Sequence, residues 1–170
     1  HLAPLGGAGE AMAGEVLAEV EHLAVRWLDG RAAVFADRLA GGHAVDGHGD
    51  LLCEDIFCLD DGPRILDCIE FDDHLRHVDV WNDVAFLAMD LERLGRPDLA
   101  AVLRDTYREM SADTALPGLV DVFVAYRALV RAKVAGLRVA QLSAHALPAE
   151  YSAADGARRR YLDVALACTR

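Results

Sequence analysis

One segment, residues 48–73, constrains the fold of this chain more than any other (HGDLLCEDIFCLDDGPRILDCIEFDD). It carries nine of the chain's 28 acidic residues in 26 positions, and two short apolar runs, 56–59 and 65–66, lie between the acids. Residues 60–63 (DDGP) are turn formers that separate the two runs. The segment therefore predicts a loop, a strand, a tight turn and a second strand, which together form a β-hairpin.

Such a hairpin brings carboxylates from both of its strand ends to one edge. Crowded carboxylates repel one another unless a cation or a positively charged substrate lies among them. Oxygen ligands suit Mg²⁺, which usually keeps several waters and is shared with phosphates. The segment therefore predicts a site for magnesium, for a metal-bound nucleotide or for a cationic substrate.

A motif with kinase-like spacing opens this segment. The triplet 48–50 (HGD) is followed, five residues after its Asp, by Asp55. In a kinase catalytic loop that position holds a metal-binding Asn. Residues 69–72 (IEFD) end the hairpin, where a second metal ligand belongs, and residues 79–83 (DVWND) open the next helix.

Taken together, the run from this triplet to Leu91 resembles the aminoglycoside phosphotransferase-like kinases. More narrowly, it is similar to the bacterial branch that is often fused to a P-loop ATPase domain, and the resemblance covers residues 30–140. It implies that residues 1–170 form a single domain, the C-terminal lobe of a protein-kinase-like fold. The sequence has no Gly-rich loop followed by a strand Lys, so the N-terminal lobe that covers ATP is expected to be absent. Because the chain begins at His1 in a predicted loop, we expect a fragment of a longer protein.

The resemblance also implies roles in catalysis and cofactor binding. Asp50 would be the catalytic base that takes the proton of the substrate hydroxyl. Asp55 and Glu70 would bind the metal and the nucleotide. His48 would contribute to the nucleotide site, and Asp72 would be a further metal ligand.

Further residues are expected to contact the substrate or to support the site. Asp67 is a candidate for a substrate contact, and Asp83 would hold the catalytic loop by accepting hydrogen bonds from backbone N–H groups. Arg127 and Arg131 are four residues apart in a predicted helix and share a face. This basic pair is directed at the acidic edge or at a phosphate, or else it forms a solvated stripe.

Two residues depart from the family pattern. Asp55 stands where the family has Asn, and Glu70 stands where it has the metal-binding Asp. Both can ligate magnesium through oxygen, but they add negative charge beside a phosphate. An alternative therefore stays open, a non-catalytic kinase-like binding or regulatory module attached to another enzyme. A metal-dependent hydrolase ranks lowest, because the chain lacks a His-rich metal set.

Composition and charge limit the partners. The net charge is −11, and no basic run is long enough to contact nucleic acid. No apolar run reaches the ~20 residues that span a bilayer, and no basic start marks a signal peptide. We expect a cytoplasmic protein with no nucleic-acid or membrane partner. The four cysteines lack the C-x-x-C spacing of a zinc site and are predicted to be small, buried thiols.

Apolar residues at helical spacing predict helices over most of the remaining chain. The predicted ranges are 9–28, 31–40, 79–95, 97–112, 119–144 and 150–168. Asp79 is a predicted N-cap, and residues 73–78 are expected to form a loop. The predicted fold class is mainly α with a small β-hairpin (α+β). The predicted activity is ATP-dependent phosphorylation of a hydroxyl on a small molecule, with Mg²⁺ and ATP as cofactors; the acidic segment favours a cationic acceptor without identifying it.

Overall fold

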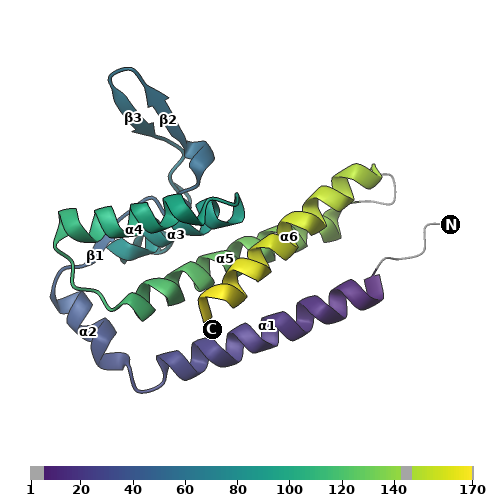
Figure 1. The fold of residues 1–170 in the computed structure, drawn as a ribbon, viewed down its shortest axis with the longest axis horizontal. Coiled ribbons are helices and arrows are strands. Elements are labelled where there is room, and N and C mark those ends of the chain that lie inside the picture. The colour runs from purple at the N-terminus through teal and green to yellow at the C-terminus, as the bar shows by residue number, and fades with distance from the viewer. Residues whose placement is uncertain (1–5, 143–146, 170) are drawn as a thin grey trace.

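The computed structural model describes residues 6–142 and 147–169 (Figure 1). The helices are α1 (Gly6–Leu28), α2 (Ala32–Ala40), α3 (Val80–Arg93), α4 (Pro97–Ser111), α5 (Pro117–Gln141) and α6 (Pro148–Thr169). The strands are β1 (Ala44–Asp46), β2 (Ile56–Leu59), β3 (Gly62–Ile65) and β4 (His77–Asp79). Two 3₁₀ turns, η1 (Cys53–Asp55) and η2 (Asp73–Leu75), complete the described elements.

The predicted helices all form, with ends that shift by a few residues. Residues 143 and 144 of the fifth predicted helix lie outside the described part of the chain. Asp79 caps α3 as predicted, because its side chain accepts a hydrogen bond from the N–H of Trp81. Pro97 and Pro117 stand in the first turns of α4 and α5, where a missing N–H costs nothing. The mainly helical fold with a small hairpin is confirmed.

One sheet was not predicted. Residues 73–78, expected to be a loop, contain η2 and enter strand β4, which pairs antiparallel with β1 in the register Val45↔Val78. Each strand has only three residues, too few for an alternating pattern to identify. The pairing joins segments more than 30 residues apart, and it brings the loop after β1 against the start of α3.

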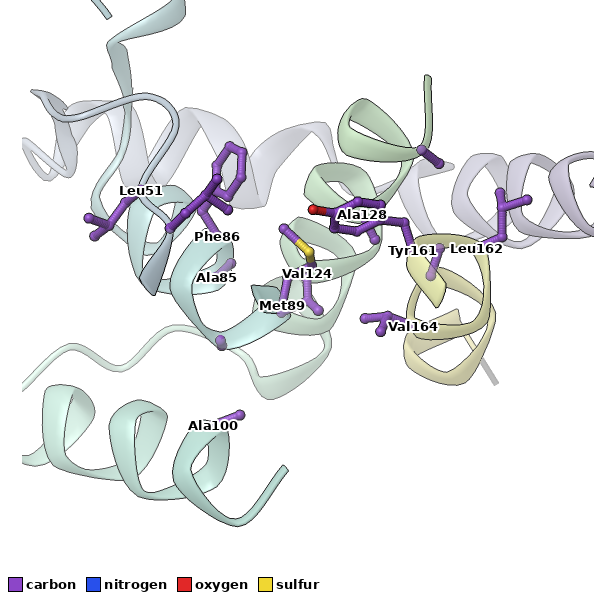
Figure 2. Close-up of a cluster of buried hydrophobic side chains, with 14 of the residues drawn as sticks. Leu51, Ala85, Phe86, Met89, Ala100, Val124, Ala128, Tyr161, Leu162 and Val164 are labelled. Atoms are coloured by element: carbon purple, nitrogen blue, oxygen red, sulfur yellow. The ribbon is translucent and has the colours of Figure 1, made fainter. Parts of the chain in front are cut away.

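The main core lies where α3, α5 and α6 pack together (Figure 2). α3 contributes Phe86 and Met89, α5 contributes Val124, and α6 contributes Tyr161. The most deeply buried stripe of α3 runs through Trp81, Ala85, Phe86, Ala88 and Met89. Val80, Val84, Leu87 and Leu91, which share a second stripe of the helix, are only half-buried. No helix in the described part of the chain is long and apolar enough to cross a membrane.

A second cluster lies at the other end of α3, around Trp81. Its indole packs against Leu119 of α5 and edge-on against Tyr107 of α4, with ring centroids 4.8 Å apart. Beside it, Arg38 of α2 binds the carboxylates of Asp79 and Asp113, the latter through Nη2 to Oδ2 at 2.9 Å. These pairs tie α2 to the N-terminus of α3, and the sequence patterns did not indicate them.

The β2–β3 hairpin projects away from the helices (Figure 1). Strand β2 matches its prediction, but the second strand is residues 62–65 instead of 65–66, because Asp60 and Asp61 alone form the turn. Its apolar side chains are largely exposed, including Phe57 and Ile65. The prediction of buried thiols is wrong for the two cysteines in or near the hairpin, Cys58 and Cys68, which are exposed.

Candidate functional site

The candidate site is built on the loop that follows β1. Gly49 has φ +87°, in the left-handed region, and a Cβ there would lie 3.0 Å from Cδ1 of Ile69. A Cβ on Gly47 would collide with Oδ2 of Asp83. The two glycines therefore let the backbone pass close to both the hairpin and α3, and they direct the chain into Asp50.

Asp83 holds this loop. One carboxylate oxygen accepts a hydrogen bond from the N–H of His48 at 2.6 Å, and the other accepts one from the N–H of Gly49 at 2.9 Å. This is the backbone contact that the sequence predicted for Asp83. Because the carboxylate stands in the first turn of α3, the helix fixes the position of the residue that precedes Asp50.

Asp50 is half-buried and paired with a cation. Nη1 of Arg131 on α5 lies 3.1 Å from Oδ2 and 3.4 Å from Oδ1 of Asp50. Burial raises the pKa of the Asp50 carboxyl above its usual value; the charge of Arg131 opposes this and that of Asp55 adds to it. Asp50 and Arg131, both predicted site residues, are therefore in contact.

Asp50 also lines a pocket of about 320 Å³ at the base of the hairpin. The other lining residues are Asp67, Cys68, Ile69, Glu70 and Phe71. Three predicted acids, Asp50, Asp67 and Glu70, thus share one cavity. Asp67 has φ +67°, a conformation that is uncommon for a residue other than glycine.

Asp55 and His48 lie beside this pocket but are not among its lining residues. Oδ2 of Asp55 accepts a hydrogen bond from the N–H of Leu52 at 2.8 Å, which closes the η1 turn. Nε2 of His48 lies 2.8 Å from the carbonyl oxygen of Leu66, and its Nδ1 is buried without a hydrogen-bond partner. Both side chains shape the loop between Asp50 and the hairpin.

The predicted metal set is not assembled. Asp72 uses its carboxylate to accept a hydrogen bond from the N–H of His74, at the start of η2, and it does not line the pocket. Among the residues that the structure describes, no group of three His, Cys, Asp or Glu side chains is placed to hold a metal ion. Asp55, Glu70 and Asp72 are not brought together as one group among these residues, and their role as metal ligands stays a prediction.

Arg127 lies one turn before Arg131 on α5 and is only 5% exposed, so the alternative of a solvated stripe is wrong for this residue. Its Nε donates to Oδ1 of Asn82 at 2.7 Å, and its guanidinium lies over the ring of Phe86, 4.8 Å from the centroid. Burial lowers the pKa of Arg127, and the charges of Tyr126, Asp83 and Asp50 oppose that shift.

Sequence reasoning missed two supporting residues of α3. Asn82 orients Arg127, and Asp90, which is 1% exposed, accepts a hydrogen bond from the N–H of Cys53 at 3.0 Å. Asp83 and Asp90 are seven residues apart, just under two helical turns, so both reach the same loop. The sequence signal for both residues was a polar side chain next to the apolar stripe of α3.

The comparisons with known proteins name no function. No protein-family profile and no solved structure matches the chain. It is 48% identical over 134 residues to an uncharacterized protein of Mycobacterium tuberculosis and to one of Mycobacterium bovis. Each match covers 79% of this chain and 27% of the relative, so the chain spans about a quarter of the length of these curated relatives.

Proposed function

We propose that this chain is the catalytic and substrate-binding lobe of a kinase-like small-molecule phosphotransferase. The observation that carries the proposal is the pocket that Asp50 shares with Asp67 and Glu70, beside a loop held by Asp83. Phosphoryl transfer depends on positioning and charge more than on covalent help from the protein. The loop that fixes Asp50 would supply the positioning, and a cation held by the acids of the pocket would supply the positive charge.

In the proposed reaction, the acceptor hydroxyl oxygen attacks the γ-phosphorus of ATP. The new O–P bond forms as the bond from phosphorus to the bridging oxygen breaks, and ADP leaves. Asp50 accepts the proton of the hydroxyl. The raised pKa of Asp50, which burial causes, brings this carboxylate closer to the basicity that proton transfer needs.

Magnesium suits the donor set of the pocket, because carboxylate oxygens are the ligands this ion prefers. Glu70 and Asp67 line the cavity beside Asp50 and would hold the ion. Two carboxylates suffice, since Mg²⁺ commonly completes its shell with waters and with the phosphates of the nucleotide. When bound, it would neutralise charge on those phosphates.

The test is the Asp50→Asn variant of the complete gene product, assayed with ATP, Mg²⁺ and a panel of hydroxylated acceptors that includes amino sugars, nucleosides and anionic acceptors. Removal of a general base is expected to lower kcat by about 10²-fold or more. Glu54→Gln is the matched control, since Glu54 is an exposed acid of the same segment and no pocket residue. Wild-type turnover in Asp50→Asn would remove Asp50 from this role.

A second candidate is a non-catalytic kinase-like binding or regulatory module. It is favoured by the ion pair between Asp50 and Arg131, which engages both oxygens of the proposed base. Thermal melting of the complete gene product with millimolar Mg²⁺ and ADP separates the candidates. A rise in Tm supports the phosphotransferase, because a ligand that binds the folded state stabilises it. An unchanged Tm supports the module.

A further inference from the structure

The side of Asp50 that faces α5 has the opposite charge to the pocket. The pocket presents Asp67 and Glu70, whereas α5 presents Arg131 and, one turn earlier, Arg127. Asp50 stands between the two regions and is in contact with Arg131 at 3.1 Å. A molecule that reaches Asp50 therefore meets acidic side chains on one side and the partly exposed guanidinium of Arg131 on the other, with Arg127 buried one helical turn earlier.

Both arginines have hydrogen-bond donors that the described residues leave without acceptors. Nη2 of Arg127 and Nε of Arg131 are buried and have no hydrogen-bond partner among the described residues, while the Arg131 side chain also hydrogen-bonds to Tyr161. No carboxylate in the described part of the chain lies within ion-pair distance of Arg127, although Asp83 and Asp50 act on it from further away. Buried polar groups are nearly always satisfied, so each of these donors needs an acceptor, which an ordered water or a bound oxyanion would supply.

Arg127 is also held rigidly enough to bind a ligand without much loss of entropy. Asn82 fixes its Nε, and its guanidinium lies over the rings of Phe86 and Tyr126. A planar guanidinium in a fixed orientation matches the oxygens of a carboxylate or a phosphate. Arg131 is less enclosed, with a side chain that is 23% exposed, so it is the arginine that an incoming ligand meets first.

From these contacts we propose that Arg127 and Arg131 recognise an oxyanion, a phosphate or a carboxylate, on the hydroxylated acceptor, and that this oxyanion draws Arg131 away from Asp50. The acceptor's own anion then competes with the Asp50 carboxylate for the same guanidinium. An acceptor with an oxyanion frees the base, and a neutral or cationic acceptor leaves the ion pair in place. The inference rests on the proposed function only where it names the acceptor as the carrier of the anion.

The net charge of the chain and the local charge beside Asp50 favour different substrates. The chain has a net charge of −11, which favours a cationic substrate, yet the cations beside Asp50 favour an anionic one. The two are compatible if the acidic pocket serves the metal ion and the basic pair serves the acceptor. Specificity is then set by the two arginines of α5 and not by the net charge.

The first experiment measures binding to the complete gene product without ATP. The probes share a hydroxyl and differ in charge: glycerol 3-phosphate, glycerate, glycerol and ethanolamine. Calorimetry is expected to give the two oxyanions at least about tenfold higher affinity than the other two, the range for a hydrogen bond to a charged group. Equal affinity for all four probes would overturn the proposal.

Variants locate the binding site. Arg131→Gln is expected to lower oxyanion affinity about tenfold. Arg131→Lys keeps the positive charge but not the planar guanidinium, so its loss of affinity is expected to be smaller. Asp50→Asn is expected to raise the affinity, because the competing carboxylate is gone. Arg138→Gln is the matched control: it removes an exposed cation in the last turn of α5. An equal loss in Arg138→Gln would mean that general charge causes the effect, which overturns the proposal.

The wild-type chain offers a readout that does not depend on any variant folding. NMR signals of the arginine Nε–Hε groups are expected to shift for Arg131 and Arg127 on addition of glycerol 3-phosphate. If ADP alone shifts them and glycerol 3-phosphate does not, the anion belongs to the nucleotide and the inference is wrong.

The outcomes separate this inference from the proposed function. If the protein binds oxyanions at Arg131 but transfers no phosphoryl group, the proposed function is wrong and this inference stands. If the protein phosphorylates an amino alcohol and shows no preference for oxyanions, this inference is wrong and the proposed function stands.

Discussion

The helical body and the acidic segment 48–73 are stabilised in different ways. In α3, α5 and α6 the side chains interlock, and Phe86, Met89 and Val124 are fully buried. In the acidic segment, only Gly49, Leu51 and Leu52 are buried. The segment keeps its shape through hydrogen bonds within it and through external hydrogen bonds that its backbone N–H groups donate to other parts of the chain.

Those external hydrogen bonds come mainly from α3. Asp83 accepts from the loop before Asp50, and Asp90 accepts from the N–H of Cys53 just after it. The candidate site is thus a weakly packed segment fixed at two points to a strongly packed helix. The geometry of the site therefore depends on two acids of α3, a helix that is anchored in the core.

The largest expected effect on stability comes from a matched pair of aromatic truncations, one in each region. Phe86→Ala removes a ring that is 0% exposed, and it is expected to destabilise the protein by about 3–5 kcal/mol. Phe57→Ala removes a ring of the hairpin that is 50% exposed, and less than about 1 kcal/mol is expected. Urea denaturation measures both free energies of unfolding. Similar losses would show that the hairpin is packed as tightly as the body.

An intermediate effect is expected at the two attachment points. Asp83→Asn and Asp90→Asn keep the shape of the side chain but lose its charge, so each is expected to cost about 1–3 kcal/mol. Hydrogen exchange separates them. Asp83→Asn should speed exchange of the His48 and Gly49 amides and spare Cys53, and Asp90→Asn should do the reverse. Uniform acceleration in both variants would show that the segment opens as one unit.

Alkylation of the cysteine thiols is expected to have the smallest effect on stability, and the four thiols are expected to differ clearly in their rates of alkylation. Burial raises the pKa of Cys53 to about 11 and that of Cys168 to about 12, so few thiolates form at either residue at pH 8. Iodoacetamide at pH 8 should therefore modify the exposed Cys58 and Cys68 first, with little change in Tm. Mass spectrometry of digested protein identifies the sites. Early modification of Cys168 would contradict the burial of α6 against α3.

Much of the fold was predictable because its signals are local. The periodicity of residues 79–95 identifies α3, and Asp79 marks its start because a short acidic side chain caps the first free N–H groups. The DDGP sequence at 60–63 places the hairpin turn, although only its first two residues form it. The strand pair β1–β4 was not predictable, since three residues carry no usable period and their partners are distant in the chain.

The candidate site was predictable in part. The HGD triplet indicated Asp50, and the start of α3 indicated Asp83, whose backbone contacts form as expected. Asp72 caps the η2 turn, a role that its spacing did not indicate, and its predicted role as a metal ligand stays a prediction. Asn82 and Asp90 were missed because a polar residue beside an apolar stripe has no defined role until its partner is known.

The sequence by itself determined where the helices and the hairpin lie, because helical periodicity and turn chemistry are set by neighbours within a few residues. Only the tertiary structure decided what Asp50 contacts. Its partner Arg131 is 81 residues away, and the two meet because α3 and α5 bury their apolar faces against each other. The charges at the site are therefore set by core packing, which no local pattern specifies.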